Sequence, residues 1–539
     1  MHDKPNFGTV NEPLPIVKTK YGNVMGATVD RVAVFRGIPY GGRCDRERRF
    51  LPAQEPESWD GVRDCTKNGP ICVQTAGSIS DPILAGGHPE KLGLKYETQD
   101  ENCLCLNVLT PGIDKHKRPV MVYIHGGGYW QLSGTILTAA DALPREQDIV
   151  TVSVNHRLHV LGYLYLGDLD PKYADSGNVG HLDLILALKW VQDNIEAFGG
   201  DPDNVTIMGE SGGSDKVLTL THMPEAHGLF HKAIAISCFL PVGRLTKELA
   251  ASYTLEVLKI LGIPKNHPER LLELPARYIT EKVFDPCTHL WCMTFAPVAD
   301  GIHLFPGIGK GYVPAFDTNV PMIVGASEDE IASFDAENSF DITENNLREK
   351  MLERGADYGL PFNESNVDAV VAAFRETNEK HDTADHLFMK MMSIKSFMGG
   401  AYYLAEDYAR MGKGPVYQYL NRYDAPHAAY PERTYAGHCV DLYGALRLVG
   451  YPQMEEYSRK IADAYGAFMR TGDPSVEGLA WPAFDLTHRA TMVYDRVFHV
   501  ESDPIRRERE ALDGVIGREG PVDCYTNKDY CFPLDKKLL

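Results

Sequence analysis

The chain has 539 residues, of which 44% are hydrophobic and 24% charged, a composition typical of a globular protein with enough apolar material for a large core. The formal net charge of −20 argues against nucleic acid as a partner and disfavours binding to anionic membrane surfaces, because both require a basic face. No run approaches the ~20 apolar residues that span a bilayer.

The start of the chain, Met1 to Asn6, lacks the apolar core of a signal peptide. This favours a cytoplasmic protein, or a secreted one if a leader has been removed. The eleven cysteines are odd in number, so at least one is unpaired, and their spacing forms no paired zinc-ribbon pattern. The chain contains neither an internal repeat nor a linker-like cluster, so we expect one domain over residues 1–539.

In chain order, residues 15–40 are expected to form short strands separated by turns. Apolar runs typical of buried parallel strands follow at 120–124, 149–154, 205–208, 233–236, 320–324 and 416–420. Apolar residues recur at helical spacing from Leu184 to Phe198, which predicts a crossover helix, and further helices are expected around 255–261 and 461–469. This alternation predicts an α/β fold with helices on both faces of a mostly parallel sheet. Residues 335–410 are mostly helical in pattern and are expected to form a cap over the catalytic face.

The motif that carries the most chemistry is Gly-Glu-Ser-Gly-Gly at 209–213, directly after the strand expected at 205–208. A G-x-S-x-G sequence between a strand and a helix is typical of a nucleophile elbow, in which the serine hydroxyl stands exposed at the start of the helix. A glycine-rich turn with an incidental serine is the alternative. The preceding strand and the following helix-compatible residues favour Ser211 as a nucleophile.

A second glycine-rich loop, His-Gly-Gly-Gly-Tyr at 125–129, follows the strand expected at 120–124. Acyl transfer places negative charge on the former carbonyl oxygen, and backbone N–H groups must already point at that oxygen. Consecutive glycines suit this task because no Cβ atom blocks the substrate. A phosphate-binding loop would instead need the G-x-x-x-x-G-K-[ST] pattern, which this loop lacks. The loop is therefore predicted to form an oxyanion hole.

A serine nucleophile needs a general base, and the base needs a carboxylate that fixes its tautomer. His438 follows the strand expected at 416–420, and the pattern alone does not exclude His427. After the strand at 320–324 come Glu328, Asp329 and Glu330, and an acidic run of this kind is usually a solvated turn. From the pattern alone, the choice among these three acids stays open.

Taken together, these blocks resemble the type-B carboxylesterase/cholinesterase family over residues 16 to 500. The resemblance is carried by blocks in the same order along the chain: Phe-Arg-Gly-Ile-Pro-Tyr at 35–40, Glu-Asn-Cys-Leu-Cys-Leu-Asn at 101–107, the glycine loop at 125–129, Asn-His-Arg at 155–157, Gly-Asn-Val-Gly at 177–180, Phe-Gly-Gly-Asp-Pro at 198–202, the motif at 209–213, and Ala-Pro-Val-Ala-Asp-Gly at 296–301. The resemblance implies an α/β-hydrolase fold.

The resemblance also implies roles for particular residues. It assigns Ser211, Glu330 and His438 to the catalytic triad, and it makes Glu210 an acid that supports the site electrostatically. The oxyanion hole is implied to consist of the N–H groups of Gly127, Gly128 and Gly212. Ser237 matches a serine near the triad. The aromatic residues beside catalytic positions are candidate pocket walls, so the expected substrate-binding residues are Tyr129, Trp130, Glu210 and Phe334.

Other matches are structural. Arg157 with Asp183, and Arg49 with Glu101, align with family salt bridges. Cys72 and Cys103 align with the first family disulfide, which is expected only in an oxidising compartment.

The segment between these cysteines contains no tryptophan, although cholinesterases use one there to bind quaternary ammonium by cation–π attraction. Position 212 is glycine where many members have alanine. The sequence therefore looks closer to microbial para-nitrobenzyl-type esterases than to cholinesterases.

The expected function is hydrolysis of small to medium carboxylic esters through an acyl-enzyme, with no metal and no cofactor. The same machinery could act on an amide, carbamate, lactone or thioester. A non-catalytic adhesion protein of the same fold is a further alternative, but those proteins lose the nucleophile and carry a membrane anchor. The expected partner is a small-molecule ester.

Overall fold

The computed structural model describes most of the chain. The described residues are 14–75, 98–238, 245–287, 295–305, 319–333, 339–355, 360, 362–377, 383–426, 433–449 and 451–516.

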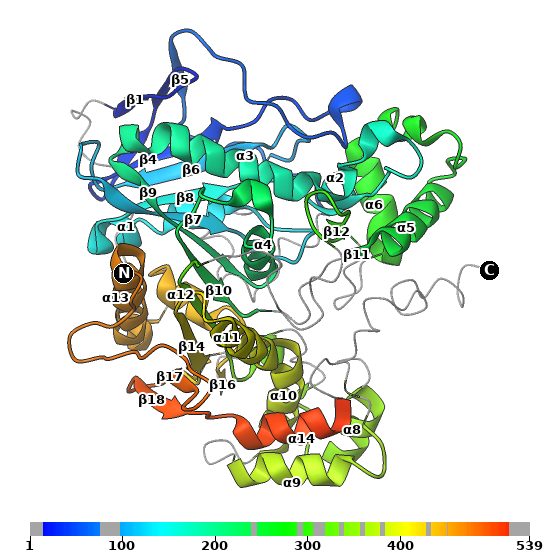
Figure 1. The fold of residues 1–539 in the computed structure, drawn as a ribbon, viewed down its shortest axis with the longest axis vertical. Helices are drawn as coiled ribbons and strands as arrows, with labels where there is room; N and C mark the ends of the chain where they lie inside the picture. The colour runs from blue at the N-terminus through cyan, green and yellow to red at the C-terminus, as the bar shows by residue number, and fades with distance from the viewer. Residues whose placement is uncertain are drawn as a thin grey trace.

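An eleven-stranded sheet forms the centre of the structure (Figure 1). From one edge to the other, its strands are β18 (His499–Ser502), β17 (Ala490–Tyr494), β14 (Val416–Asn421), β13 (Met322–Ser327), β10 (Lys232–Ile236), β9 (Gly200–Glu210), β7 (Arg118–Ile124), β8 (Val150–Val154), β6 (Cys105–Thr110), β4 (Val32–Pro39) and β3 (Ala27–Val29). All pairs from β17 to β8 are parallel, and the strands outside them pair antiparallel. The predicted mostly parallel sheet is confirmed, and each of the six apolar runs from 120–124 onward overlaps one of its strands, although residue 149 and residues 320–321 lie just before β8 and β13.

The central strands β8, β10, β13 and β14 are buried along their whole length because both faces of the sheet are covered. Side chains alternate between the faces. On one face Val122 belongs to the same core as Leu188 of α3 (Val179–Asn194). On the other face Tyr123 belongs to a second core with Tyr465 of α13 (Glu455–Thr471). The predicted helices 184–198 and 461–469 therefore lie on opposite faces (Figure 1).

Smaller elements complete the described part of the chain. One small sheet contains β1 (Ile16–Lys18), β2 (Asn23–Met25) and β5 (Val62–Asp64), and two others pair β11 (Leu245–Thr246) with β12 (Val298–Ala299) and β15 (Ala425–Pro426) with β16 (Thr434–Tyr435). Further helices are α1 (Ala142–Gln147), α2 (His159–Tyr163), α4 (Gly212–Leu220), α5 (Lys247–Ile260), α6 (Ala276–Cys287) and α12 (Val440–Ala445). None of the described helices is both long and apolar enough to cross a bilayer.

The region predicted to be helical, 335–410, contains α8 (Leu347–Arg354), α9 (Val367–Thr377), α10 (Ala384–Ser393) and all but the last residue of α11 (Gly399–Met411). The C-terminal helix α14 (Arg506–Ile516) lies beside α9 at the same end of the molecule (Figure 1). The function of this region as a cap, and the single-domain organisation, stay predictions.

Candidate active site

The candidate nucleophile Ser211 lies between the end of β9 and the start of α4. Its φ of 56° and ψ of −126° are rarely adopted by residues other than glycine, which indicates backbone strain. The turn is held by the Ser211 N–H, which donates to the Ile236 carbonyl at 3.0 Å, and by the Ser214 N–H, which donates to the Ser211 carbonyl at 2.9 Å. The residue is partly exposed, so a substrate can reach it.

The glycines around this serine have no room for a side chain. A Cβ atom on Gly209 would collide with the carbonyl oxygen of Gly213, and a Cβ atom on Gly213 would collide with the carbonyl oxygen of Ile124. Both obstacles are backbone atoms, which cannot move without disturbing β7 or α4. The strand-turn-helix geometry therefore requires glycine at both positions.

The glycine loop at 125–129 packs against this turn. Gly127 and Gly128 have φ values of 76° and 59°, which other residues rarely adopt. A Cβ atom on Gly126 would lie 2.9 Å from Oε2 of Glu210 and 3.4 Å from Cβ of Ser211. Gly212 in turn touches the backbone of Gly128 so closely that a Cβ atom would overlap it. The structure thus brings the predicted oxyanion residues together beside Ser211.

A buried lysine of α4, Lys216, contacts the glycine loop. Nζ of Lys216 donates to the His125 carbonyl at 3.0 Å and lies 5.5 Å from the centre of the Tyr129 ring. Burial lowers the pKa of Lys216 to about 7, and burial also lowers the pKa of His125 well below its usual range. Nδ1 of His125 lies 3.0 Å from the Gly126 carbonyl oxygen, so the ring is held within the loop.

The candidate base and its carboxylate are in direct contact. Nδ1 of His438 is hydrogen-bonded to Oε2 of Glu330. The other carboxylate oxygen, Oε1, accepts from the Ser327 N–H at 2.7 Å and from the Ser237 hydroxyl at 2.7 Å. All four residues are buried. Glu330 is thus fixed in the orientation that an imidazole-orienting carboxylate needs.

The two neighbouring acids point elsewhere. Glu328 forms buried ion pairs with Lys390 at 3.0 Å and with Arg422 at 3.1 Å. Oδ2 of Asp329 accepts from the Ala436 N–H at 3.2 Å. Among the three acids that the sequence pattern left open, Glu330 is the one whose carboxylate meets the His438 ring. His427 lies outside the described residues.

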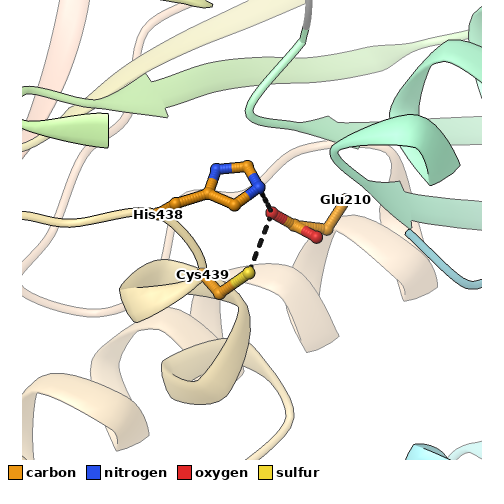
Figure 2. Close-up of side chains that lie close together, drawn as sticks. All are labelled: Glu210, His438 and Cys439. Atoms are coloured by element: carbon orange, nitrogen blue, oxygen red, sulfur yellow. Dashed lines mark hydrogen bonds and ion pairs between the residues drawn. The ribbon is translucent and has the colours of Figure 1, made fainter. Parts of the chain in front are cut away.

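The other ring nitrogen of His438 contacts a different acid. Nε2 lies 2.9 Å from Oε1 of Glu210, and Sγ of Cys439 donates to the same oxygen at 3.1 Å (Figure 2). Burial by itself lowers the pKa of His438, but the charges of Glu210, Cys439 and Glu330 outweigh burial and raise this pKa well above its usual range. Burial and the nearby Glu210 carboxylate raise the pKa of the Cys439 thiol.

The helical region contributes residues that sequence reasoning missed. The Ile331 N–H, next to Glu330, donates to the Ser393 hydroxyl of α10 at 3.0 Å. The segment Ile394–Met398 that follows is a π-helix, a form often found at functional sites, and it places the Phe397 ring 5.2 Å from the His438 ring. No motif marks these residues, because their spacing is that of an ordinary helix. The sequence shows that Cys439 follows His438, but it does not show the backbone conformation of Cys439.

The expected pocket residues differ in position. The Tyr129 ring is buried and packs edge-on against Tyr163 with ring centres 5.1 Å apart. Trp130 is partly exposed, and its ring covers Gly128. Phe334 lies outside the described residues. Roles for these side chains in substrate binding stay predictions.

Two structural expectations from the resemblance are seen directly. The salt bridges Arg157–Asp183, at 2.7 Å, and Arg49–Glu101, at 2.6 Å, are both present. The remaining pair, Cys72 and Cys103, consists of buried free thiols. The two thiols are not joined by a disulfide in this structure, and the pairing stays a prediction.

Comparison with known proteins agrees with this geometry. The model of the carboxylesterase family matches residues 13–509. The para-nitrobenzyl esterase of Bacillus subtilis is 31% identical over 515 residues, which cover 92% of this chain and 98% of that protein. The crystal structure of the Geobacillus stearothermophilus carboxylesterase EST55 has a TM-score of 0.75 at 31% identity, with 92% of this chain and 99% of that chain covered.

An esterase from the anaerobe Clostridium hathewayi, described as able to hydrolyse aliphatic aromatic polyesters, also has a TM-score of 0.75 at 31% identity, and the match covers 93% of this chain and 98% of that one. These matches run through the whole described sheet and confirm the α/β-hydrolase fold. The chain belongs to the carboxylesterase family and is an enzyme that hydrolyses carboxylic esters.

Proposed function

We propose that the chain hydrolyses small to medium carboxylic esters through an acyl-enzyme formed on Ser211, with His438 as general base and Glu330 as the carboxylate that orients it. The observation that carries this proposal is the contact between Nδ1 of His438 and Glu330, while Nε2 of the same ring lies 2.9 Å from Glu210, the residue before Ser211. The developing oxyanion accepts hydrogen bonds from three backbone N–H groups, those of Gly127, Gly128 and Gly212.

The chemistry is a pair of acyl transfers. Oγ of Ser211 bonds to the ester carbonyl carbon while its proton passes to Nε2 of His438. Collapse of the tetrahedral intermediate breaks the bond to the alcohol, which leaves with the proton from Nε2. A water molecule then gives one proton to Nε2 as its oxygen attacks the acyl-enzyme. Collapse of this second tetrahedral intermediate breaks the bond to Oγ of Ser211, which takes the proton back from Nε2, and the acid leaves.

Glu210 has a part in this sequence because it contacts the base in the resting state. Before attack, Nε2 must exchange the Glu210 carboxylate for the Ser211 hydroxyl as its partner. Once the proton has moved to Nε2, the carboxylates of Glu210 and Glu330 flank the imidazolium and stabilise its charge. Glu210 therefore stabilises the protonated base at the cost of raising the pH at which the neutral base becomes available.

The substrate side is proposed from the residues beside the glycine loop. The Trp130 ring lies over Gly128, next to the proposed oxyanion position, and offers an apolar wall. The helical region at 335–410 is proposed to close the catalytic face, since α10 and the following π-helix contact the loops of both Glu330 and His438. These features suit an uncharged ester of modest size.

The test is hydrolysis of p-nitrophenyl esters of increasing acyl length by wild type and by Ser211→Ala. We expect turnover of the short and medium esters and a loss of at least about 10³-fold in kcat for the variant. A p-nitroanilide, a carbamate and a thioester of the same acyl group, measured in parallel, test the related substrate classes. Equal turnover by the two proteins would show that Ser211 is not the nucleophile.

A further inference from the structure

Three side chains with different metal-ligand chemistry, those of Glu210, His438 and Cys439, meet at one point, and Glu210 directly precedes Ser211 (Figure 2). Oε1 of Glu210 lies 2.9 Å from Nε2 of His438 and 3.1 Å from Sγ of Cys439. One ligand atom of each residue lies within 4.8 Å of those of the other two, and all three residues are buried. Over the described ranges of the chain, no other three His, Cys, Asp or Glu side chains converge in this way.

The convergence of two consecutive residues depends on the backbone at Cys439. Its φ of 69° lies in the left-handed region, which is uncommon for cysteine, and the residue directly precedes α12. Consecutive side chains of an extended segment point to opposite sides. Here the imidazole of His438 and the thiol of Cys439 both reach the Glu210 carboxylate (Figure 2). The turn therefore places nitrogen, sulfur and oxygen around one point.

The second nitrogen of His438 gives an independent indication. Nδ1 is hydrogen-bonded to Glu330, which is itself held by Ser327 and Ser237. Histidines that bind a metal donate their other N–H to a carboxylate in the same manner, which fixes the tautomer and leaves a lone pair on the ligating nitrogen. In this chain the nitrogen that faces Glu210 is Nε2, and its lone pair becomes available to a cation when Nε2 gives up its proton.

We propose that Glu210, His438 and Cys439 bind a thiophilic divalent cation, with Zn²⁺ as the reference ion, and that the bound cation inhibits ester hydrolysis. A carboxylate, an imidazole and a thiolate are all zinc ligands, and tetrahedral bonds of about 2.0–2.3 Å separate ligand atoms by about 3.3–3.8 Å. The present contacts need to open by only a few tenths of an ångström.

The charges and protons of the binding step balance. The Glu210 carboxylate and the Cys439 thiolate together neutralise a dication, and His438 binds in its neutral form. The thiol proton of Cys439 and the Nε2 proton of the His438 imidazolium are both released to solvent as the bonds to the metal form. The fourth tetrahedral position is left for a water molecule.

The inhibitory effect rests on the proposed function. The Nε2 lone pair that would accept the Ser211 proton is the one that binds the cation. The two uses exclude each other, so hydrolysis stops while the cation is bound and returns when a chelator removes it. A hard cation such as Mg²⁺, which prefers oxygen ligands, is not expected to inhibit.

The experiment uses full-length protein without a polyhistidine tag. Zn²⁺ inhibition of p-nitrophenyl ester hydrolysis is measured for wild type, Cys439→Ala, Cys439→Ser and the control Cys65→Ala, each relative to its own metal-free rate. Cys65 is a buried free thiol of a loop next to the small sheet and matches Cys439 in chemistry. In parallel, Co²⁺ is added and the thiolate-to-cobalt charge-transfer band is recorded, which requires no turnover. Ser211→Ala is included in the Co²⁺ series.

We expect chelator-reversible inhibition of wild type and of Cys65→Ala. We expect at least about a 100-fold higher half-inhibitory Zn²⁺ concentration for Cys439→Ala, because loss of a direct ligand should cost at least as much as loss of an outer partner. The Co²⁺ band should be present in wild type, Cys65→Ala and Ser211→Ala, and absent from both Cys439 variants. Equal Zn²⁺ sensitivity of wild type and Cys439→Ala, or a wild type without the Co²⁺ band, would overturn the site. A Co²⁺ band that persists while Zn²⁺ leaves hydrolysis unchanged would overturn the inhibitory role and count against His438 as the base.

Discussion

Nε2 of His438 lies 2.9 Å from Oε1 of Glu210, so the imidazole is held between two carboxylates in the resting enzyme, with Glu330 on its other nitrogen. These charges raise the pKa of His438 well above its usual range despite burial. Since only the neutral imidazole can take a proton from Ser211, the acidic limb of the pH–activity profile should report this pKa.

Glu210→Gln removes one of the two flanking charges. The pKa of His438 should then fall, because the imidazolium loses a stabilising partner while burial continues to oppose its charge. The acidic limb of kcat/KM is therefore expected to move to lower pH. On the alkaline plateau kcat should drop about tenfold, equivalent to ~1.4 kcal/mol of lost stabilisation of the imidazolium in the transition state. The measurement is a pH series of kcat/KM with a p-nitrophenyl ester.

A matched control is Glu477→Gln, which removes the same charge from an exposed position. Its profile should overlay that of wild type. An acidic limb that stays in place in Glu210→Gln, or moves to higher pH, would contradict the coupling between Glu210 and His438.

Glu330→Gln tests which of the three consecutive acids orients the base. The amide keeps the size of the side chain but no longer stabilises the imidazolium, and it favours the wrong tautomer. We expect kcat to fall by about 10³- to 10⁴-fold. Asp329→Asn is the control, because its carboxylate binds the Ala436 N–H and not the imidazole. It should retain activity within about tenfold, equivalent to ~1.4 kcal/mol. Similar losses in the two variants would mean that the loop as a whole, and not the Glu330 carboxylate, matters.

The sequence predicts this fold well because local pattern and global topology agree. Each of the six apolar runs from 120–124 onward overlaps a buried strand, and the stretch from Leu184 to Phe198 lies in α3 and the short 3-10 turn Ile195–Phe198 that follows it. The turn of Ser211 was predictable because its geometry leaves room only for glycine at the flanking positions. A steric requirement of this kind fixes the residue type at a single position, so it can be recognised in the sequence.

The rest of the site depends on contacts between distant parts of the chain, which no local pattern records. Glu328, Asp329 and Glu330 have the same chemistry, and only their surroundings separate them. Lys390, which forms an ion pair with Glu328, lies in a helix more than fifty residues further along the chain. The position of the Cys439 thiol depends on one left-handed backbone angle. The family resemblance identified Glu330 and His438 as catalytic candidates, but it did not predict the contacts of Cys439 or Lys390.

Gly213→Ala tests the closeness of the catalytic turn to β7. The added methyl group would overlap the carbonyl oxygen of Ile124, a backbone atom inside the sheet. We expect a loss of about 2 kcal/mol or more in the free energy of unfolding, together with loss of esterase activity. Urea denaturation, monitored by tryptophan fluorescence, measures the free energy of unfolding. Hydrolysis of a p-nitrophenyl ester measures the esterase activity.

Gly514→Ala is the control for which we expect the opposite change in the free energy of unfolding. Gly514 lies exposed in α14, and a Cβ atom there would meet no atom within 4 Å. Alanine favours the helix over glycine by about 0.5–1 kcal/mol, so this variant should be more stable and fully active. Equal stability of the two variants would show that the collision at Gly213 is relieved by backbone movement.

Lys390→Met tests the buried ion cluster that joins the helical region to the catalytic loop. Nζ of Lys390 lies 3.0 Å from Glu328 and 3.1 Å from Glu508, and all three side chains are buried. Removing the cation leaves two carboxylates buried without it. The expected cost is about 3–5 kcal/mol of unfolding free energy at neutral pH. Lys460→Met, which breaks a surface pair with Glu456, should cost no more than about 0.5 kcal/mol.

The pH dependence of this cost separates an electrostatic origin from lost packing. Burial by itself raises the pKa of Glu328, but Lys390 and Arg422 outweigh it and lower this pKa from 4.5 to about 2. A carboxylate whose folded-state pKa is depressed contributes stability that is complete above about pH 4.5 and is lost as the pH falls toward about 2. In Lys390→Met the carboxylates can instead be protonated at mildly acidic pH, which removes the penalty of their burial. The difference in unfolding free energy between wild type and Lys390→Met should therefore shrink as the pH is lowered from 7 through this window. Urea unfolding at each pH measures it. A difference that stays constant with pH would mean that lost packing of the lysine side chain accounts for the whole effect.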